Sequence, residues 1–396
     1  IAANVTTLIT GIILFIFGSG PITGFATTLV IGVITSFITS VFLTRLMLET
    51  YVSRENAKDL AFTTKATSAF LQNTKIDFIG KRKTFYIISG VIIFISILGL
   101  TFKGLSYGID FTGGRNYIVQ FEEKVNVEKV RSLLENTFEG SSVQAISIGT
   151  NNDKVRLSTK YKIEENTETV DNEIEAKLYN SLKPLLKNTT LDQFVKKNIV
   201  NSQKVGPTIA EDIKTSAIWA VILSLLGVSL YIFIRFNHFA FSMGTMLCLA
   251  HDTIIIIGSF ALLWGIMPFS MEIDLNFIAA ILTYIGFSVN DTVVIFDRIR
   301  ENTGLYPKRD KKDVINEALN ETLSRTFSTS MSVLVVLFAI FIFGGDTIRG
   351  FIFALLIGSI LGVYSTLFVA VPVAYDIMIS RNKKKELKAA NAELKK

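Results

Sequence analysis

The residues from 276 to 302 place an acid inside a stretch that is otherwise long and apolar enough to cross a membrane. Asp291 stands there beside Asn290, and an arginine pair, Arg298 and Arg300, follows where the apolar run ends. An ionisable group at that depth is costly unless it is paired or hydrated, so its default interpretation is functional. The chemistry open to it is the gain and loss of a proton. The alternative is an acid near the interface whose side chain reaches water.

Polar side chains follow one face of the same predicted helix. Tyr284, Ser288, Asp291 and Arg298 are separated by steps of four, three and seven residues, which bring them onto one side. The other faces consist of Ile, Leu, Ala, Val and Phe, which suit lipid or neighbouring helices. We therefore take Asp291 as the central site residue and Ser288, Asn290 and Arg298 as its polar support.

Two more places bring charge into apolar runs. His251 and Asp252 lie near the middle of the run 239–264, and Arg325 comes directly before the run 326–344. Two carboxylates and an arginine on neighbouring helices can hold one another's charge, and protonating one acid would then repack the group. Asp291, Arg325, Asp252 and His251 are thus the candidate proton-coupling residues.

Ordinary explanations exist for each of these residues. Arg325 also fits an arginine at the cytoplasmic end of a span, and His251 also fits a satisfied core histidine. Two intramembrane acids further raise the possibility of an aspartyl protease. That chemistry needs both acids on one water, and its usual GxGD context is absent because Asp291 follows Ser-Val-Asn.

Composition excludes most soluble classes. Of the 396 residues 49% are hydrophobic, mean hydropathy is +0.45, and the apolar residues come in runs of about 20, the length that crosses a bilayer. The net charge of +6 comes from loops between spans, so no nucleic-acid partner is needed to explain it. One cysteine and two histidines exclude a disulfide framework and leave little for a zinc site.

Eight spans are predicted, and the basic residues indicate their orientation. Lys and Arg are concentrated in the linker 49–83, the loop 298–325 and the tail 379–396, whereas the remaining short turns contain neither. The linker and the tail are therefore predicted to be cytoplasmic, and the large polar segment 103–212 to lie outside. The predicted spans are 5–19, 22–48, 84–102, 213–235, 239–264, 274–297, 326–344 and 349–378.

The polar segment 103–212 is predicted to be an α+β domain. Strands are expected over 116–121, 143–148, 154–159 and 198–205, with a turn at Asn151-Asn152-Asp153, and helices over 127–138 and 164–186. The order β-α-β-β-α-β is that of a ferredoxin-like unit. The segment contains no phosphate loop, no nucleophile beside a base and no metal-ligand spacing. We expect a binding or mechanical domain, not an enzyme, and no cofactor.

The chain contains an internal repeat with an offset of 326 residues. Phe15-Ile16-Phe17-Gly18 recurs as Phe341-Ile342-Phe343-Gly344, and eleven of the twenty positions from 15 to 34 are identical in the second copy. Small residues recur every fourth position in each copy, which makes a helix face suited to close packing. Both copies have the same predicted orientation. We therefore expect 1–48 to end one repeat and 84–378 to form a complete six-span repeat.

Four motifs in this order resemble the SecD/SecF family. They are Gly108-Ile109-Asp110-Phe111-Thr112-Gly113-Gly114, His251-Asp252, Ser288-Val289-Asn290-Asp291-Thr292-Val293-Val294 continuing into Asp297-Arg298-Ile299-Arg300-Glu301-Asn302, and Thr322-Leu323-Ser324-Arg325-Thr326. Residues 84–378 resemble SecF and residues 1–48 resemble the end of SecD. Together they are similar to a fused SecDF protein-export membrane protein of the RND superfamily.

The resemblance implies a multi-pass protein of the bacterial cytoplasmic membrane that assists the Sec translocon. It would use protons, with no other cofactor, to draw unfolded preproteins out on the extracytoplasmic side. The essential acid and arginine of the family match Asp291 and Arg325. One departure is Ala2-Ala3-Asn4, where SecD usually reads Asp-Ala-Asn. The start at Ile1 inside an apolar run leads us to expect a longer natural chain.

Two other functions fit the same pattern. An RND-type exporter of lipids or small molecules would share the spans but usually carries larger outer domains. A scaffold that holds translocon partners together without proton coupling would share the topology. Proton dependence of export separates the scaffold from a motor, and substrate binding separates the exporter.

Overall fold

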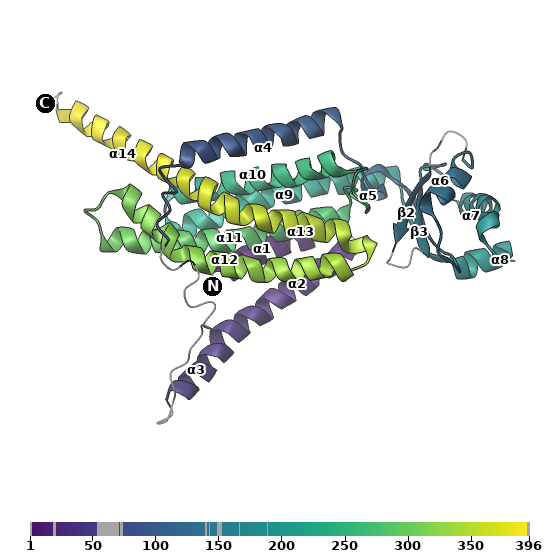
Figure 1. Cartoon of the computed structure of the whole chain (residues 1–396), viewed down its shortest axis with the longest axis horizontal. Coiled ribbons are helices and arrows are strands. Elements are labelled where there is room, and N and C mark those ends of the chain that lie inside the picture. Colours follow the sequence, from purple (N-terminus) through teal and green to yellow (C-terminus); the bar gives the residue numbers. More distant parts are fainter. Residues whose placement is uncertain are drawn as a thin grey trace.

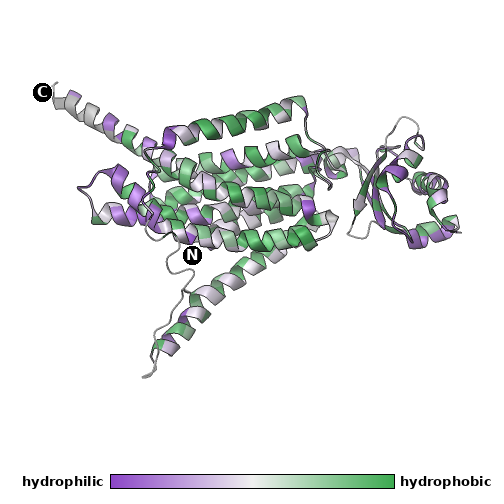
Figure 2. Cartoon of the chain, viewed as in Figure 1, coloured by the Kyte–Doolittle hydropathy of each residue, from purple (hydrophilic) through white to green (hydrophobic). Residues whose placement is uncertain are grey.

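Long apolar helices make up most of the chain. The computed structural model describes residues 2–18, 21–53, 71, 74–138, 141, 143–148, 153–165, 167–187 and 189–393. Within these residues seven helices are long and apolar enough to cross a membrane, and an eighth apolar helix, Asn4–Phe17, is shorter. Figure 2 shows apolar residues along the whole bundle and hydrophilic residues gathered at its ends. The predicted polytopic helical membrane protein is thus confirmed.

The bundle is built around α11 (Leu275–Leu305), in which most side chains are buried. Its neighbours are contributed by both ends of the chain (Figure 1). The other helices are α1 (Ala2–Phe17), α2 (Pro21–Ile38), α3 (Thr44–Val52), α4 (Arg82–Phe102), α9 (Pro207–Phe236), α10 (Phe239–Leu263), α12 (Lys311–Phe343), α13 (Asp346–Ser365) and α14 (Val371–Glu393).

Helices α11 and α12 are longer than predicted. The expected loop 298–325 is largely helical, and only residues 306–310 join the two helices. Hydropathy detects the apolar part of a helix, whereas these polar turns are held by ion pairs between the two helices. Arg298 Nε lies 2.7 Å from Glu321 Oε2, and Asn302 donates to the same oxygen at 2.9 Å. Asp310 caps α12 by accepting from the Lys312 amide.

A small α+β domain follows α4, which we call the sheet domain (residues 108–205). Its four strands are antiparallel in the order β2-β3-β1-β4, as in a ferredoxin-like fold. Helices α6 and α7 cover one face, where their buried side chains join those of the strands. The elements are β1 (Gly114–Gln120), α6 (Val127–Leu134), β2 (Val143–Ile148), β3 (Lys154–Thr159), α7 (Glu168–Leu182) and β4 (Ile199–Val205).

Details of the sheet domain differ from the sequence-based expectation. Helix α7 begins at Glu168, four residues after the predicted start, and ends at Leu182 in a 3-10 turn that contains Pro184, near which the helix was expected to stop. Three short elements were not predicted: α5 (Ile109–Thr112), α8 (Leu191–Gln193) and a π turn (Phe194–Asn198). The expected turn at Asn151-Asn152 and most of the linker 49–83 lie outside the described residues.

One buried arginine organises the edge of the sheet domain. Arg115 is 2% exposed, and its guanidinium lies 2.8 Å from Asp171 Oδ1. It also donates to the carbonyls of Tyr161, Lys162 and Glu165. Burying this charge is tolerable because each nitrogen finds an acceptor. Strand β1, helix α7 and the segment after β3 are thereby held together.

The internal repeat has a structural counterpart. A π turn follows α2 at Thr39–Leu43, and another follows α13 at Thr366–Ala370, within one residue of the repeat offset. The two copies differ in their surroundings: Figure 1 shows α13 inside the bundle, whereas α2 leaves it at an angle. The sheet domain lies at one end of the bundle, and the α11–α12 connection and the end of α14 lie at the other.

Candidate functional site

Helix α11 is held tightly by α1. Thr6 and Thr7 both donate to the carbonyl of Gly286, at 3.3 and 3.2 Å. A Cβ at Gly286 would lie 2.3 Å from the Thr10 hydroxyl, so only glycine allows this approach. The polar start of α1 thus packs on α11 through Thr6 and Thr7, five residues before Asp291.

Asp291 is half-buried between α11 and α12. Its carboxylate accepts hydrogen bonds from Ser330 Oγ at 3.0 Å and from Thr329 Oγ1 at 3.3 Å. Neither Asp291 nor Arg325 belongs to an ion pair within 4 Å among the described residues. The carboxylate is therefore held by neutral hydroxyls, which can also serve its protonated form.

Arg325 does not form the expected contact with Asp291. It is exposed on α12, one turn before Thr329, whose hydroxyl donates to the Arg325 carbonyl at 3.0 Å. It is close enough for its charge to act on Asp291. The sequence correctly placed Arg325 on the helix that follows the one carrying Asp291. The rotation of α12 gives the contact with the Asp291 carboxylate to Thr329 and Ser330 instead.

The other predicted supports of Asp291 are engaged elsewhere or unpaired. Arg298 forms ion pairs with Glu301 and Glu321 at 2.8 and 2.7 Å, two helical turns beyond the acid. The Asn290 side-chain oxygen is buried and has no hydrogen-bond partner among the described residues. Arg298 therefore belongs to the polar end of the helix pair α11 and α12. The Asn290 side-chain oxygen offers a free hydrogen-bond acceptor beside Asp291.

A second carboxylate, Asp252, lies in a separate and fully buried cluster. Tyr284 Oη donates to Asp252 Oδ2 at 2.5 Å, and Ser365 Oγ donates to the same oxygen at 2.6 Å. His251 Nδ1 lies 2.7 Å from Asp252 Oδ1, while His251 Nε2 is buried without a partner among the described residues. Cys248 also faces this carboxylate. The cluster joins α10, α11 and α13.

Ser288 belongs to the Asp252 cluster and not to Asp291. Its hydroxyl oxygen lies 3.1 Å from Tyr284 Oη, and both residues pack against the small-residue face of α13. A Cβ at Gly358 would lie 2.6 Å from the Tyr284 ring. The single network expected for both acids is thus two networks, one between α11 and α12 and the other among α10, α11 and α13. Tyr284 connects the network around Asp252 to α11, the helix that carries Asp291.

Sequence reasoning missed several partners in these networks. Tyr284 was placed on the polar face, but its contact with Asp252 was not expected. Ser365, Thr329 and Ser330 come from helices whose rotation hydropathy does not fix. The spacing of Gly358 and Gly362 opposite Tyr284 and Ser288 was the available signal, since small residues mark where a large side chain enters.

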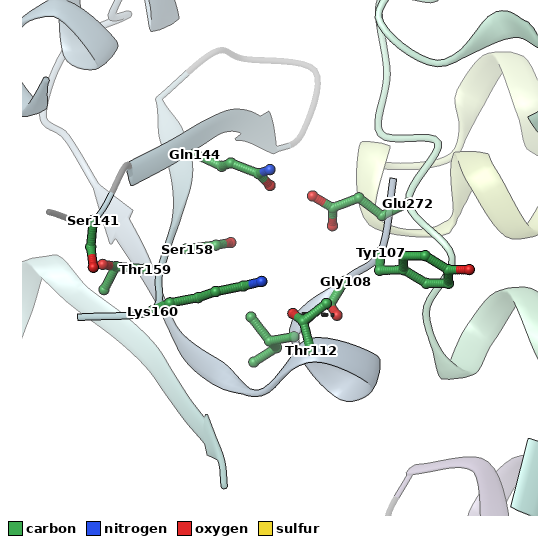
Figure 3. A pocket seen from close by; sticks show the side chains of 10 residues that line it. Tyr107, Gly108, Thr112, Ser141, Gln144, Ser158, Thr159, Lys160 and Glu272 are labelled. Carbon is green, nitrogen blue, oxygen red and sulfur yellow. Dashed lines mark hydrogen bonds between the residues drawn. The ribbon is translucent and has the colours of Figure 1, made fainter. Parts of the chain in front are cut away.

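The described residues contain no group of three acidic, histidine or cysteine side chains able to hold a metal ion. Several cavities lie where the sheet domain meets the bundle. One of about 390 Å³ is lined by residues of both parts, with Lys160 and Glu272 on facing walls (Figure 3). The chemistry of the bundle is therefore that of two carboxylates, hydroxyls and an imidazole, which can bind and release protons.

Comparisons with known proteins agree with this architecture. Residues 185–380 match the family described as protein export membrane protein SecD/SecF, C-terminal, and residues 98–125 match the SecD/SecF GG motif. The chain is 36% identical to the protein translocase subunit SecF of Rhodothermus marinus over 77% of this chain and 94% of that protein. It is 33% identical to SecDF of Bacillus subtilis over 94% of this chain and 49% of that protein.

Solved structures show the same similarity. The crystal structure of SecDF, a translocon-associated membrane protein, from Thermus thermophilus matches 96% of this chain and 48% of its own, with a TM-score of 0.78 and 28% identity. A crystal structure of SecDF in a super-membrane-facing form matches 98% of this chain with a TM-score of 0.67. The chain therefore spans about half the length of these SecDF relatives.

Proposed function

This chain belongs to the SecD/SecF family of protein-export membrane proteins, and on that premise we propose that it uses the proton gradient to drive late-stage export of preproteins. It acts as an accessory part of the Sec protein translocase in the cytoplasmic membrane. The observation that carries the proposal is the environment of Asp291. A carboxylate inside a span, bound by two hydroxyls and by no cation within 4 Å, keeps hydrogen-bond partners in either protonation state.

Protonation of Asp291 changes the contact between α11 and α12. The charged carboxylate accepts from both Thr329 and Ser330, and it attracts the Arg325 guanidinium from one turn away. The neutral acid loses that attraction and can donate one hydrogen bond. Arg325 therefore serves as the mobile charge partner, and Asp252 with His251 forms a second, buried site for a proton.

The orientation follows from the basic residues. The α11–α12 connection and the tail face the cytoplasm, and the sheet domain faces the outside, where it meets the unfolded preprotein. The exposed apolar sides of α2, α4 and α12 face lipid, the Sec channel or its accessory membrane proteins. The work is done by protons, without a hydrolytic step and without another cofactor.

The energy available is sufficient for a conformational cycle. One charge moving through about 150 mV releases roughly 3.5 kcal/mol, at about 2.3 kcal/mol per 100 mV. Switching a two-state element from 1:99 to 99:1 requires about 5.5 kcal/mol. One proton falls short of this requirement, whereas two protons per cycle, which release roughly 7 kcal/mol, suffice to move the sheet domain.

The proposal is tested by replacing Asp291 with asparagine. Asp291→Asn keeps the shape and an acceptor but cannot exchange a proton, so export and proton uptake should both fall at least tenfold. Asp297→Asn is the matched control, because Asp297 lies on the same helix but pairs with Arg235 and Arg300 at its polar end. Both variants are measured in vesicles from cells in which the variant replaces the native protein.

Three outcomes separate the alternatives. Export and proton uptake that survive Asp291→Asn would refute the proposed coupling. Export stimulation that persists after the proton gradient is collapsed would identify a scaffold. Saturable binding of a lipid or small molecule that depends on Asp291 would identify an exporter.

A further inference from the structure

The sheet domain is attached to the start of α11 by a short backbone seam. The amide of Gly108 donates to the Ile273 carbonyl at 3.0 Å, and the amide of Ile273 donates to the Ser106 carbonyl at 2.7 Å. These bonds make an isolated parallel bridge between Tyr107 and Ile273. The segment that enters the sheet domain is therefore fixed two residues before α11 begins.

An acid of the sheet domain reaches the first amide of the same helix. Leu275 N donates to Asp110 Oδ2 at 3.1 Å, while Asp274, the helix's own N-cap, accepts from Phe277 N at 2.8 Å. The first amides of a helix lack partners within it, and the helix dipole favours negative charge there. Two carboxylates thus cap one helix, and only Asp110 comes from the sheet domain.

Asp110 is joined to the sheet through a sterically constrained connection to β1, and its helix α5 also packs against α9. It lies in α5, which is joined to the central strand β1 through Gly113 and Gly114. Their φ angles are +70° and +139°, which L side chains rarely adopt. A Cβ at Gly113 would lie 2.7 Å from Ile163, and one at Gly114 would lie 2.9 Å from the Thr159 carbonyl. The two glycines therefore determine the direction of the chain between α5, which carries Asp110, and β1.

The surroundings of the seam leave room for movement. A cavity of about 390 Å³ separates β2 and β3 from Glu272 in the loop before α11 (Figure 3). Another, of about 560 Å³, lies between β2 and the same loop, and Glu272 lines it too. A third, smaller cavity lies beside Asp110, Arg156 and Asp274. The space on both sides of the seam is thus incompletely filled, so the bonded seam is a natural pivot.

We propose that Asp110 is a positioning residue that couples the sheet domain to α11, the helix that carries Asp291. Helix α11 is continuous from Leu275 to Asp291, roughly 24 Å at 1.5 Å per residue. A shift or rotation of α11 at Asp291 therefore reaches Leu275, and through Asp110 it reaches the sheet. The consequence for export rests on the proposed function, whereas the mechanical coupling does not.

The coupling is tested by a distance measured between spin labels at Lys196→Cys and Ile266→Cys. Both sites are exposed, at 71% of the Lys196 side chain and 68% of Ile266, and the native Cys248 is buried. Asp291→Asn should shift the distance distribution when the rest of the chain is native. The shift should disappear in the Asp110→Ala background and persist in Asp274→Ala.

The variants distinguish coupling from loss of a helix cap. Asp274→Ala removes a capping acceptor from the same helix end but no contact with the sheet domain, so it controls for helix stability. Asp110→Asn keeps an acceptor oxygen for Leu275 and should preserve the shift, which also guards against an Asp110→Ala variant that fails to fold.

Three results would overturn the proposal: no shift with Asp291→Asn in the native background, a shift that survives in Asp110→Ala, or equal effects of Asp110→Ala and Asp274→Ala. Export that is unaffected by Asp291→Asn would instead refute the proposed function and leave the distance result standing.

Discussion

Tyr284 is the residue through which the acid-bearing helix holds a second, fully buried carboxylate. Replacing it with phenylalanine removes the donor to Asp252 and the hydrogen bond to Ser288 without changing the ring. A buried acceptor is then left with one partner fewer, at a cost of about 2 kcal/mol. We expect Tyr284→Phe to lower the free energy of unfolding by that amount, seen as a lower thermal midpoint in detergent.

Tyr364→Phe is the control for that experiment. Tyr364 lies on α13, is partly buried, and exchanges its hydrogen bonds with Ser89 and the Phe85 carbonyl, both neutral groups. Its loss should cost about 1 kcal/mol or less. Equal midpoints for the two variants would show that the Asp252 contact adds nothing to an ordinary tyrosine hydrogen bond.

The residues of the site could be predicted only in part. Asp291 was found because an acid inside an apolar run is conspicuous, and Asp252 was found in the same way. Their partners could not be found, because Thr329, Ser330 and Ser365 are common residues on other helices. Contact between two helices depends on their rotation, which hydropathy does not determine. For this reason the sequence did not show that hydroxyls of α12, and not the Arg325 guanidinium, contact the Asp291 carboxylate directly.

At the scale of elements, the internal repeat supplies its own controls. Gly358 and Gly32 occupy equivalent positions in the two copies. A Cβ at Gly358 would lie 2.6 Å from the Tyr284 ring, whereas a Cβ at Gly32 meets nothing within 4 Å. Gly358→Ala should therefore destabilise the chain by about 1–3 kcal/mol. Gly32→Ala should be neutral within about 1 kcal/mol, since alanine also favours the helix.

Thermal unfolding of the two glycine variants in detergent checks this prediction. A Gly358→Ala midpoint equal to that of Gly32→Ala would mean that Tyr284 moves aside without cost. The close approach of α13 to α11 would then carry no packing energy.

The elements themselves were largely predictable. Strands β2 and β3 were placed at their observed bounds, because their alternation of apolar and polar residues reflects one buried face. The ends of α11 and α12 were not, because ion pairs within the hairpin continue these helices beyond the apolar stretch. The short α5 escaped notice because four residues carry no periodic signal.

At the scale of the whole molecule, the contact between sheet domain and bundle concentrates acids around one guanidinium. Asp110, Glu272 and Asp274 face Arg156, and Lys160 lines the neighbouring cavity with Glu272. Burial raises the pKa of each of these three carboxyls above its ordinary value of 3.8 for the aspartates and 4.5 for the glutamate. The docked domain therefore binds protons more tightly than the undocked one.

The sign of the pH dependence follows from those directions. A carboxyl whose pKa is raised in the docked state stabilises docking when it is protonated. This stabilisation is complete at a pH below the ordinary pKa of the group, and it is lost as the pH rises through the raised pKa. We expect the distance distribution between labels at Lys196→Cys and Ile266→Cys to narrow when the pH falls from 7 to about 4, toward the ordinary pKa values of these carboxyls. Asp110→Asn should reduce this response without abolishing it, because Glu272 and Asp274 still titrate, whereas Lys187→Gln, at an exposed lysine of the same domain, should leave it unchanged. A distribution that broadens on acidification would contradict the prediction.

If the sheet domain faces the acidic side of the membrane, as proposed, the same protons that reach Asp291 first strengthen the contact through which α11 moves the sheet.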